Sequence, residues 1–295
     1  MTLAPPPPWS NDNLADAEFA AIARLLADQR GFDLHGYKDS CVRRRIVKRL
    51  RDSGASSADA YLQRLHRDPE ELDALLASIS IHVSRFFRDP ETFRALERDI
   101  LPDLCERVRA TGRNRLRLWS IGCAGGEEPY SLAMLVDELQ PAGLEIDILG
   151  SDLSADVLQV ATEARYDAER LREVPGPVRD RYFRAAAGQF RLIDRVRAMV
   201  RFQQHDILRD THLPTADLIL CRYLLIYFSR TEQERILTRL AQSLSPFGVL
   251  VLGHSEVPGG QAASLYHAEF PRERIFRRHI PPPQAAPGSP RLTDD

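Results

Sequence analysis

The stretch that decides the fold is "LWSIGCAGGEEPYSLA", residues 118–133, where an apolar run leads into a glycine-rich loop and then into a helix. This order is typical of the first strand-to-helix connection in a parallel sheet, where a ligand contacts the loop closely. The loop holds three glycines, which lack a Cβ and so allow close approach to the backbone: Gly122, Gly125 and Gly126. The helix then begins with two acids, Glu127 and Glu128. We therefore expect a ligand that fits against the backbone and tolerates negative charge.

Short apolar runs alternate with helical segments after about residue 110. Such alternation predicts an α/β fold, a mainly parallel and doubly wound sheet with helices on both faces. We expect strands at 116–122, 146–152, 216–224 and 247–253, and helices at 127–139, 154–165 and 231–244.

About thirty residues between Tyr166 and a strand beginning near Met199 interrupt this alternation. Within and after them, "QFRLI" (189–193) and "AMVRFQQ" (198–204) have the alternation of two short strands that could pair in antiparallel fashion. We therefore expect a small β-subdomain at about 167–200, inserted into the sheet order.

The first part of the chain has a helical pattern instead. Apolar residues such as Phe19, Ile22 and Leu26 recur at helical spacing, and Gly31 and Gly54 separate the helices. We expect a helical N-terminal domain over 14–98 and an α/β domain over 99–280. The proline-rich ends, 1–13 and 281–295, lack apolar periodicity and are expected to be disordered tails.

The composition favours a soluble globular protein. Of 295 residues, 43% are hydrophobic and 28% charged, and the net charge of -2 leaves any nucleic-acid or membrane-surface role to a local patch. The four cysteines show no CxxC spacing, and neither a leader nor an apolar run of about 20 residues is visible. We expect a cytoplasmic monomer without a metal, membrane insertion or nucleic-acid binding.

The two glutamates discriminate between ligand classes. Acids in the first turn interact favourably with the helix dipole, so their role could be structural only. They would also repel the pyrophosphate of a dinucleotide. S-adenosylmethionine carries a sulfonium and an ammonium and no phosphate, so it fits better. Asp152, at the end of the strand 146–152, could accept both ribose hydroxyls, or it could only cap the next helix.

Six stretches together resemble the chemotaxis-receptor glutamate methyltransferases of the CheR type. They occur in the family's order: "SRFFRDPETF" (84–93), "GCAGGEEPYSLA" (122–133), "GSDLSADVL" (150–158), "RYF" (181–183), "LILCRYLLIYF" (218–228) and "LSPFGVLVLGHSE" (244–256). The resemblance implies a helical N-terminal domain on a Rossmann-like methyltransferase sheet with a small β-subdomain. It also implies S-adenosyl-L-methionine as cofactor, S-adenosyl-L-homocysteine as product, and glutamates on the cytoplasmic helices of a chemoreceptor as substrate.

The resemblance also assigns roles to single residues. Ser84 and Arg88 would lie by the methionine part, Glu127 would meet its amino group, and Asp152 would hold the ribose. Arg88 and Tyr227 would place the substrate carboxylate. The full set of residues implied to bind the cofactor is His82, Ser84, Arg88, Gly122, Glu127, Asp152, Asp206, Ile207, Tyr223 and Leu224, with Asp206 and Ile207 beside the adenine.

The sequence departs from the family at two of these positions and at Gly125 of the glycine loop. The family usually has asparagine at the positions of His82 and Tyr223 and threonine at that of Gly125. We expect Tyr223 to lie against the adenine or its edge, the alternative being that it packs outward. A non-catalytic adaptor that retains the fold stays open on this ground, and a Rossmann oxidoreductase is disfavoured because "GCAGGEE" departs from GxGxxG.

Carboxylate methylation needs no general base, because the carboxylate is already ionised near neutral pH. His254 and Cys123 are accordingly expected to pack or to hydrogen-bond rather than to catalyse. For substrate docking, Arg44, Lys48 and Arg51 share one face of a helix, which is either a solvated face or a surface for glutamate- and glutamine-rich receptor helices. The segment that joins "RYFRAAAGQFRLI" to "DRVRAMVRF" is short, so we expect methylation without capture of a receptor tail peptide.

Overall fold

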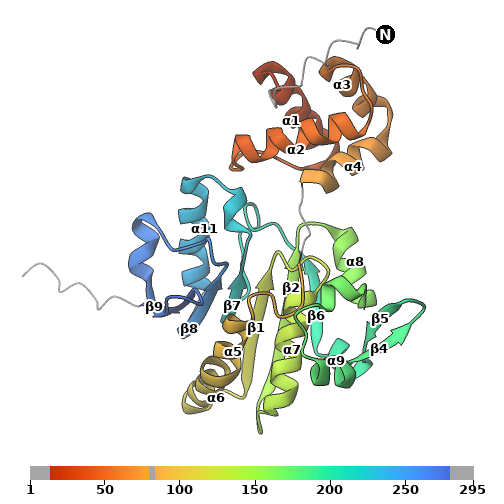
Figure 1. The fold of residues 1–295 in the computed structure, drawn as a ribbon. Helices are drawn as coiled ribbons and strands as arrows, with labels where there is room; N and C mark the ends of the chain where they lie inside the picture. The colour runs from red at the N-terminus through yellow and green to blue at the C-terminus, as the bar shows by residue number, and fades with distance from the viewer. Residues whose placement is uncertain (1–13, 80–83, 280–295) are drawn as a thin grey trace, which may run out of the picture.

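The structure is a computed structural model that describes residues 14–79 and 84–279 (Figure 1). Its first unit is a bundle of α1 (Asp16–Arg30), α2 (Asp39–Asp52), α3 (Ala58–Arg67) and α4 (Pro69–Ile79). Gly31 ends α1 in the left-handed region, at φ 64°, where a glycine is favoured. The buried side chains of these helices form a core of their own, which includes Ile22, Ile46, Tyr61 and Leu72. His82, predicted to bind the cofactor, lies outside the described residues.

A seven-stranded sheet forms the second unit, in the order β6-β2-β1-β7-β8-β10-β9. Its strands are β1 (Arg115–Ile121), β2 (Glu145–Asp152), β6 (Val200–Gln204), β7 (Ala216–Cys221), β8 (Leu244–Leu252), β9 (Tyr266–Phe270) and β10 (Ile275–Arg278). The pairs from β6 to β8 are parallel, and β10 pairs antiparallel with both β8 and β9. The strand order reverses between β1 and β7. The predicted mainly parallel α/β sheet and its strands are confirmed.

Helices cover both faces of this sheet. One core joins the sheet to α5 (Pro90–Ala95), the π-helical turn η1 (Leu96–Ile100), α6 (Leu101–Ala110) and α7 (Glu127–Leu139). The opposite core joins it to α11 (Arg230–Ser243) and the 3-10 turn η4 (Gly260–Leu265). Helix α8 (Ala155–Glu163) packs near β2 and β6. Residues 86–108 thus belong to the core of the sheet, while the core of the helical bundle ends at Ile79.

The expected pairing of 189–193 with 198–204 is wrong. A separate three-stranded sheet contains β3 (Arg165–Tyr166), β5 (Gln189–Leu192) and β4 (Phe183–Ala186), in that order. Segment 198–204 instead holds β6, which is parallel to β2 at the edge of the main sheet. The reason is the short helix α10 (Asp194–Arg197), which turns the chain away from β5. The other elements here are η2 (Ala168–Leu171) and α9 (Gly176–Tyr182).

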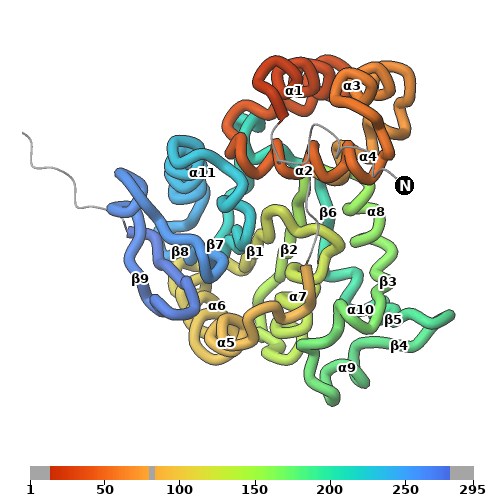
Figure 2. Tube along the Cα trace, turned by 45° about the horizontal axis from the view of Figure 1, so that its top comes forward, coloured from red at the N-terminus to blue at the C-terminus, as the bar shows by residue number. Residues whose placement is uncertain are grey.

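The helical unit sits over the carboxyl ends of the parallel strands, with α2 nearest to them (Figures 1 and 2). Lys38 Nζ donates to the carbonyl of Ile226 at 2.8 Å, and the Ser229 N–H donates to the carbonyl of Gly36 at 2.7 Å. The rings of Tyr37 and Phe228 meet edge to face at 5.0 Å between centroids. These contacts hold α2 against the loop that follows β7. Across the two described segments, no helix combines the length and apolarity that a membrane crossing requires.

Candidate active site

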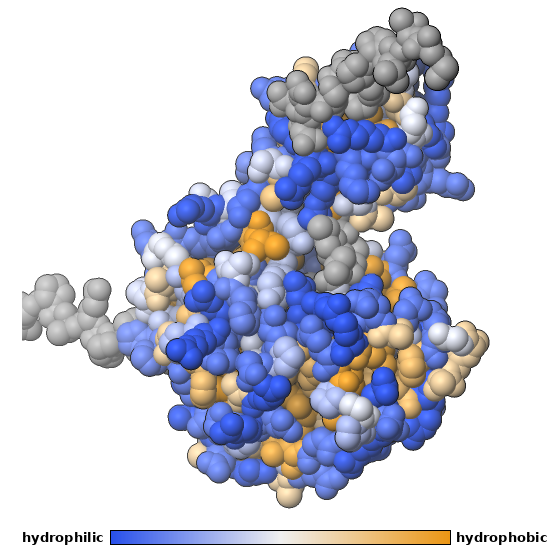
Figure 3. Space-filling model, viewed as in Figure 1, coloured by the Kyte–Doolittle hydropathy of each residue, from blue (hydrophilic) through white to orange (hydrophobic). Residues whose placement is uncertain are grey.

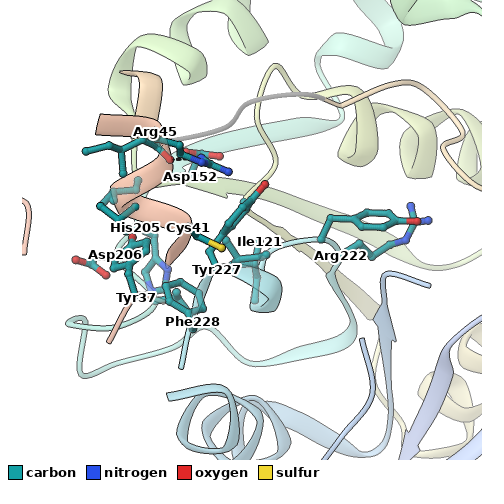
Figure 4. A pocket seen from close by; sticks show the side chains of 17 residues that line it. Tyr37, Cys41, Arg45, Ile121, Asp152, His205, Asp206, Arg222, Tyr227 and Phe228 are labelled. Carbon is teal, nitrogen blue, oxygen red and sulfur yellow. Dashed lines mark hydrogen bonds between the residues drawn. The ribbon is translucent and has the colours of Figure 1, made fainter. Parts of the chain in front are cut away.

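A cleft lies between α2 and the carboxyl ends of β1, β2, β6 and β7 (Figure 4). In the space-filling view the molecule narrows between the helical bundle and the sheet unit (Figure 3). The cleft is lined by Tyr37, Cys41, Val42, Arg45, Ile79, Ile121, Gly122, Asp152, Leu153, His205, Asp206, Ile207, Arg222, Tyr223, Leu224, Tyr227 and Phe228. It is therefore at the point of strand-order reversal, where sheets of this kind bind ligands.

The glycine loop forms the floor of this cleft. Gly122 has φ 66°, and a Cβ there would lie 3.3 Å from the methyl groups of Leu224. Gly126 has φ 86° at the start of α7, and a Cβ there would lie about as close to Phe202 and Tyr130, at 3.1 Å. Both positions combine a left-handed backbone with close packing, so a side chain at either would be strained. The predicted role of this stretch as a strand-loop-helix connection is confirmed by β1 and α7.

Asp152 ends β2, is only 6% exposed and faces the cleft (Figure 4). Its Oδ2 accepts the N–H of Ala124 at 3.0 Å, and its Oδ1 accepts the N–H of Ser154 at 3.1 Å. The carboxylate thus ties the glycine loop to the start of α8, which is the capping role considered from the sequence. The same carboxylate lines the cleft, where the hydroxyl groups of a ligand would be donors to it.

The two glutamates of α7 differ in where they point. Glu127 is 1% exposed, and its Oε1 accepts from Arg170 Nη1 at 2.6 Å. Burial raises the pKa of the Glu127 carboxyl, although Arg170 opposes this effect. Its Oε2 is buried and has no hydrogen-bond partner within the described structure. Glu128, in contrast, lines a second pocket beside the cleft and accepts from Arg222 Nη1 at 2.9 Å.

Asp206, Ile207 and Leu224 line the same cleft as Asp152. Figure 4 shows Asp206 beside His205 and Tyr37. Asp206 Oδ1 accepts the N–H of Leu208 at 2.9 Å, which fixes the loop after β6. Ile207 is buried in the core shared with α11. The structure therefore brings these three predicted residues together with Gly122 and Asp152.

The second pocket, beside the glycine loop, holds the predicted residues Ser84, Arg88 and Tyr227. The two pockets share the lining residues Gly122, Arg222, Tyr223 and Tyr227, so they adjoin each other. The Tyr227 ring lies under the guanidinium of Arg45 from α2, with Arg45 Cζ 4.8 Å from the ring centroid. This contact ties the helical bundle to the site.

Tyr223 lines both the main cleft and the second pocket. Its hydroxyl donates to Asp89 Oδ2, and Arg88 Cζ lies 3.5 Å from the centroid of its ring. These contacts hold the ring against Arg88. A position of Tyr223 beside the adenine stays a prediction. Burial, and then the bond to Asp89, raise the pKa of Tyr223.

The residues predicted to dock a receptor, Arg44, Lys48 and Arg51, are all exposed on α2. Lys48 Nζ lies 2.6 Å from Asp52 Oδ2, one turn further along the helix. The same helix turns Cys41 and Arg45 into the cleft. The structure thus places the basic face beside the site but does not bring it into the site. Of the residues not expected to catalyse, Cys123 is buried, with its pKa raised by burial, and His254 is exposed.

Sequence reasoning missed several lining residues. Three of them come from the helical unit: Tyr37, Cys41 and Arg45. No local sequence pattern predicts that α2 lies over the cleft. His205 was missed too: it is 9% exposed, and burial lowers the pKa of its imidazole. The signal that could have found it is its position directly after a strand, next to Asp206.

Glu256 is another residue whose role was not predicted, although it stands in the quoted "GHSE" stretch. It is 4% exposed and accepts the N–H groups of Tyr223 at 2.7 Å, Gly253 at 2.7 Å and Ile226 at 3.2 Å. The carboxylate therefore fixes the loop that carries Tyr223 and Tyr227.

The donors and acceptors of the site fit S-adenosylmethionine. The buried Glu127 Oε2, unpartnered within the described residues, suits an ammonium, and the Asp152 carboxylate in the cleft is the type of acceptor that ribose hydroxyls need. Acids at the start of α7 do not suit a pyrophosphate. Among residues 14–79 and 84–279, no group of three or more His, Cys, Asp or Glu side chains is arranged to hold a metal ion.

Comparison with known proteins agrees with this fit. Residues 82–272 match the family model "CheR methyltransferase, SAM binding domain", and residues 17–80 match "CheR methyltransferase, all-alpha domain". A chemotaxis protein methyltransferase of Listeria monocytogenes is 33% identical over 241 residues, covering 82% of this chain and 90% of the relative. Chemotaxis protein methyltransferase 2 of Vibrio cholerae is 29% identical over 264 residues, covering 87% and 90%.

These matches extend over both units and over the motifs that line the cleft. They exclude the oxidoreductase interpretation and favour an enzyme over an adaptor. The chain belongs to the CheR methyltransferase family, and it is a methyltransferase that uses S-adenosylmethionine.

Proposed function

We propose that the protein methylates glutamate side chains on the cytoplasmic helices of a chemoreceptor and so tunes signalling adaptation. The observation that carries the proposal is that two pockets adjoin each other. One, lined by Asp152 and Asp206, suits the nucleoside part of S-adenosylmethionine, and the other holds Arg88 and Tyr227. A substrate carboxylate that enters the second pocket would meet the cofactor at the residues shared by both.

The cofactor, when bound, supplies a methyl group on a positively charged sulfur. The substrate carboxylate forms a C–O bond to that methyl group as the C–S bond breaks, and the bonding electron pair stays on sulfur. No proton is transferred, so no residue has to act as a general base. What the protein contributes is orientation, which can be worth an effective molarity on the order of 10⁵ M, together with partial exclusion of water.

The roles proposed for single residues follow from their places in the site. Asp152 would accept the ribose hydroxyls, and Asp206 and Ile207 would flank the adenine. Glu127 and Ser84 would face the methionine part, with Gly122 and Leu224 shaping the floor between them. Arg88 and Tyr227 would hold the incoming carboxylate by a charge-assisted hydrogen bond and a phenolic one.

We further propose that α2 docks the receptor. Arg44, Lys48 and Arg51 are exposed on it, and the same helix reaches the cleft through Arg45. Receptor helices rich in glutamate and glutamine would be attracted to this face. In the β-subdomain, β4 and β5 are joined by only Ala187 and Gly188, both at positive φ, as in a two-residue hairpin turn. This short turn supports docking without a tail peptide. A monomer acting in the cytoplasm is part of the proposal.

A methyl-transfer assay with a receptor cytoplasmic fragment tests the proposal. The fragment is incubated with the protein and methyl-labelled S-adenosylmethionine, and the product is then treated with base. Methyl esters of carboxylates hydrolyse to volatile methanol, whereas methylated nitrogen does not. We expect base-released label with a fragment that carries glutamates at its methylation positions and none with its glutamine counterpart. Label that resists base, or equal label on both fragments, would contradict glutamate methylation.

A further inference from the structure

We infer that Tyr223 is a positioning residue for Arg88: its ring is the platform on which the guanidinium is held for the substrate carboxylate. The inference rests on the proposed function, because it takes Arg88 to be the group that meets the carboxylate. Its basis is the contact already described, with Arg88 Cζ 3.5 Å from the centroid of the Tyr223 ring. At that distance the guanidinium lies directly over the ring face, the geometry of a strong cation–π pair.

The backbone at Tyr223 shows that this ring position is enforced. Tyr223 has φ 57°, a left-handed conformation that is strained for a bulky aromatic residue. A hydrogen bond stabilises this strained conformation: the Tyr223 N–H donates to the buried Glu256 Oε2 at 2.7 Å. Gly253 gives the ring room, since a Cβ there would lie 2.9 Å from Tyr223 Cδ1. The loop is therefore built to direct this side chain toward the second pocket.

The far end of the ring is fixed as well. The phenol donates to Asp89 Oδ2, and the same oxygen accepts from Arg222 Nη2 at 2.6 Å. Arg222 is itself anchored by Glu128, and its side chain is 1% exposed. Asp89 is also in the left-handed region, at φ 61°, directly after Arg88. Tyr223 is thus held at its backbone and at its hydroxyl, while its face is covered by Arg88.

Stacking of Arg88 on the Tyr223 ring is compatible with the proposed binding of the substrate carboxylate by the guanidinium. Stacking engages the face of a guanidinium and does not consume the N–H donors in its plane, which are the groups that pair with a carboxylate. A guanidinium fixed on a ring loses less freedom when a substrate binds. Tyr223 should therefore act on the binding of the receptor glutamate through Arg88, and it should act little on binding of the nucleoside end.

The test compares two substitutions in the full-length protein. Tyr223→Phe keeps the ring and loses the bond to Asp89. Tyr223→Asn loses the ring and suits the left-handed backbone, which asparagine tolerates better than most residues, so this variant is expected to fold. KM and kcat for the receptor fragment are measured together with the Kd for S-adenosylhomocysteine by calorimetry and with Tm. Both substitutions are repeated in an Arg88→Ala background to form double-mutant cycles.

We expect Tyr223→Asn to lower kcat/KM for the receptor by about tenfold, within the range of cation–π pairs, mostly through KM. The Kd for S-adenosylhomocysteine should change by less than about threefold. Tyr223→Phe should retain most of the activity, and in the Arg88→Ala background Tyr223→Asn should add almost nothing.

Two results would overturn the inference while leaving the proposed function intact. One is an equal loss from Tyr223→Asn with and without Arg88. The other is a loss that appears mainly in the Kd for S-adenosylhomocysteine. If instead the wild-type protein binds S-adenosylhomocysteine but methylates no receptor glutamate, the proposed function itself fails, and the inference fails with it.

Discussion

The Asp152 carboxylate has one structural role that its contacts show and one proposed role in cofactor binding. It joins the glycine loop to α8 through the N–H groups of Ala124 and Ser154. Its place at the end of β2, facing the cleft, supports the proposed role of holding a ribose. The capping role is therefore seen in the structure, and the ribose role stays a proposal.

Asp152→Asn should weaken binding of S-adenosylhomocysteine by about 2 kcal/mol, a roughly thirtyfold rise in Kd, because a charge-assisted pair of hydrogen bonds is lost. Calorimetry measures this directly. Asp147→Asn is the matched control, since Asp147 lies on the same strand but pairs with Arg201 at 2.9 Å. An unchanged Kd for Asp152→Asn, with the fold intact, would remove Asp152 from the ribose site.

His205 predicts a pH dependence of stability. Burial, with Trp119 against its ring, lowers the pKa of the folded imidazole below its ordinary value of about 6.5. The charges of Asp210 and Asp206 raise the pKa of His205, whereas the charge of Arg239 lowers it further. The unfolded chain therefore takes up a proton that the folded protein resists, so the free energy of unfolding should fall as pH drops below about 6.5.

Thermal melts between about pH 5 and pH 7 check this, in a window around the unfolded histidine pKa and above those of ordinary carboxyls. In His205→Gln the loss of Tm on acidification should be smaller than in the wild type. The exposed His267 provides the control, and His267→Gln should follow the wild-type curve. Parallel curves for the wild type and His205→Gln would show that His205 is not responsible.

At the scale of elements, the loop after β7 depends on a residue distant in sequence. Glu256 accepts three backbone N–H groups, from Tyr223, Ile226 and Gly253, and it is buried. The Glu256 carboxylate thus supplies the acceptor for backbone N–H groups that a β-ladder would otherwise pair. The geometry of Tyr223 and Tyr227 in the site therefore depends on it.

Glu256→Ala should lower the free energy of unfolding by about 3 kcal/mol, because it leaves buried donors unsatisfied. Urea unfolding measures the change. Glu163→Ala, at an exposed position near the end of α8, should cost far less and serves as the control. A loss for Glu256→Ala no larger than that of the control would mean that the loop is held by other contacts.

The elements that could be predicted are those with a local signal. The strands β1, β2, β7 and β8 and the helix α7 follow from apolar runs, glycines and first-turn acids. The pairing of 189–193 with 198–204 could not be judged, because alternation shows that a segment is a strand but not which sheet it joins. Four residues, Asp194–Arg197, form a helical turn and send β6 to the main sheet.

The site was predictable in part for the same reason. Gly122, Asp152 and Asp206 stand where strands end, so their meeting follows from the topology. Arg45 and Glu256 reach the site only through tertiary packing, which no spacing in the sequence indicates. The direction of a side chain is also settled by its partners: Arg170 holds Glu127 and Asp89 holds Tyr223.

At the scale of the whole molecule, the helical unit completes the cleft and carries the basic face. Lys38 and Gly36 hold it to the loop after β7, and Arg45 lies over Tyr227. A receptor helix bound along α2 would therefore lie close to the second pocket. If α2 docks the receptor as proposed, this one helix would connect docking with the site.

Reversal of charge at two of its positions, Arg44→Glu with Lys48→Glu, should reduce receptor methylation by tenfold or more, on the order expected when like charges face each other. Rising ionic strength should have a similar effect on the wild type, because exposed charges are screened. Methylation rates at several salt concentrations measure both.

Arg94→Glu with Arg98→Glu is the matched control, since it reverses two exposed charges at the same spacing on the sheet unit. This control should methylate as the wild type does. Removal of the receptor's tail should leave the rate unchanged. Normal activity of the α2 double variant, combined with slower methylation of a tail-less receptor, would move docking from α2 to the β-subdomain.

The most direct test of the central claim, that the cleft under α2 is where the cofactor and the substrate meet, is a crystal structure with S-adenosylhomocysteine. We predict that the ribose hydroxyls lie on Asp152, the adenine beside Asp206 and Ile207, and the sulfur toward Arg88 and Tyr227. A ligand bound outside this cleft, or bound in it with the adenine at Arg88, would contradict the account.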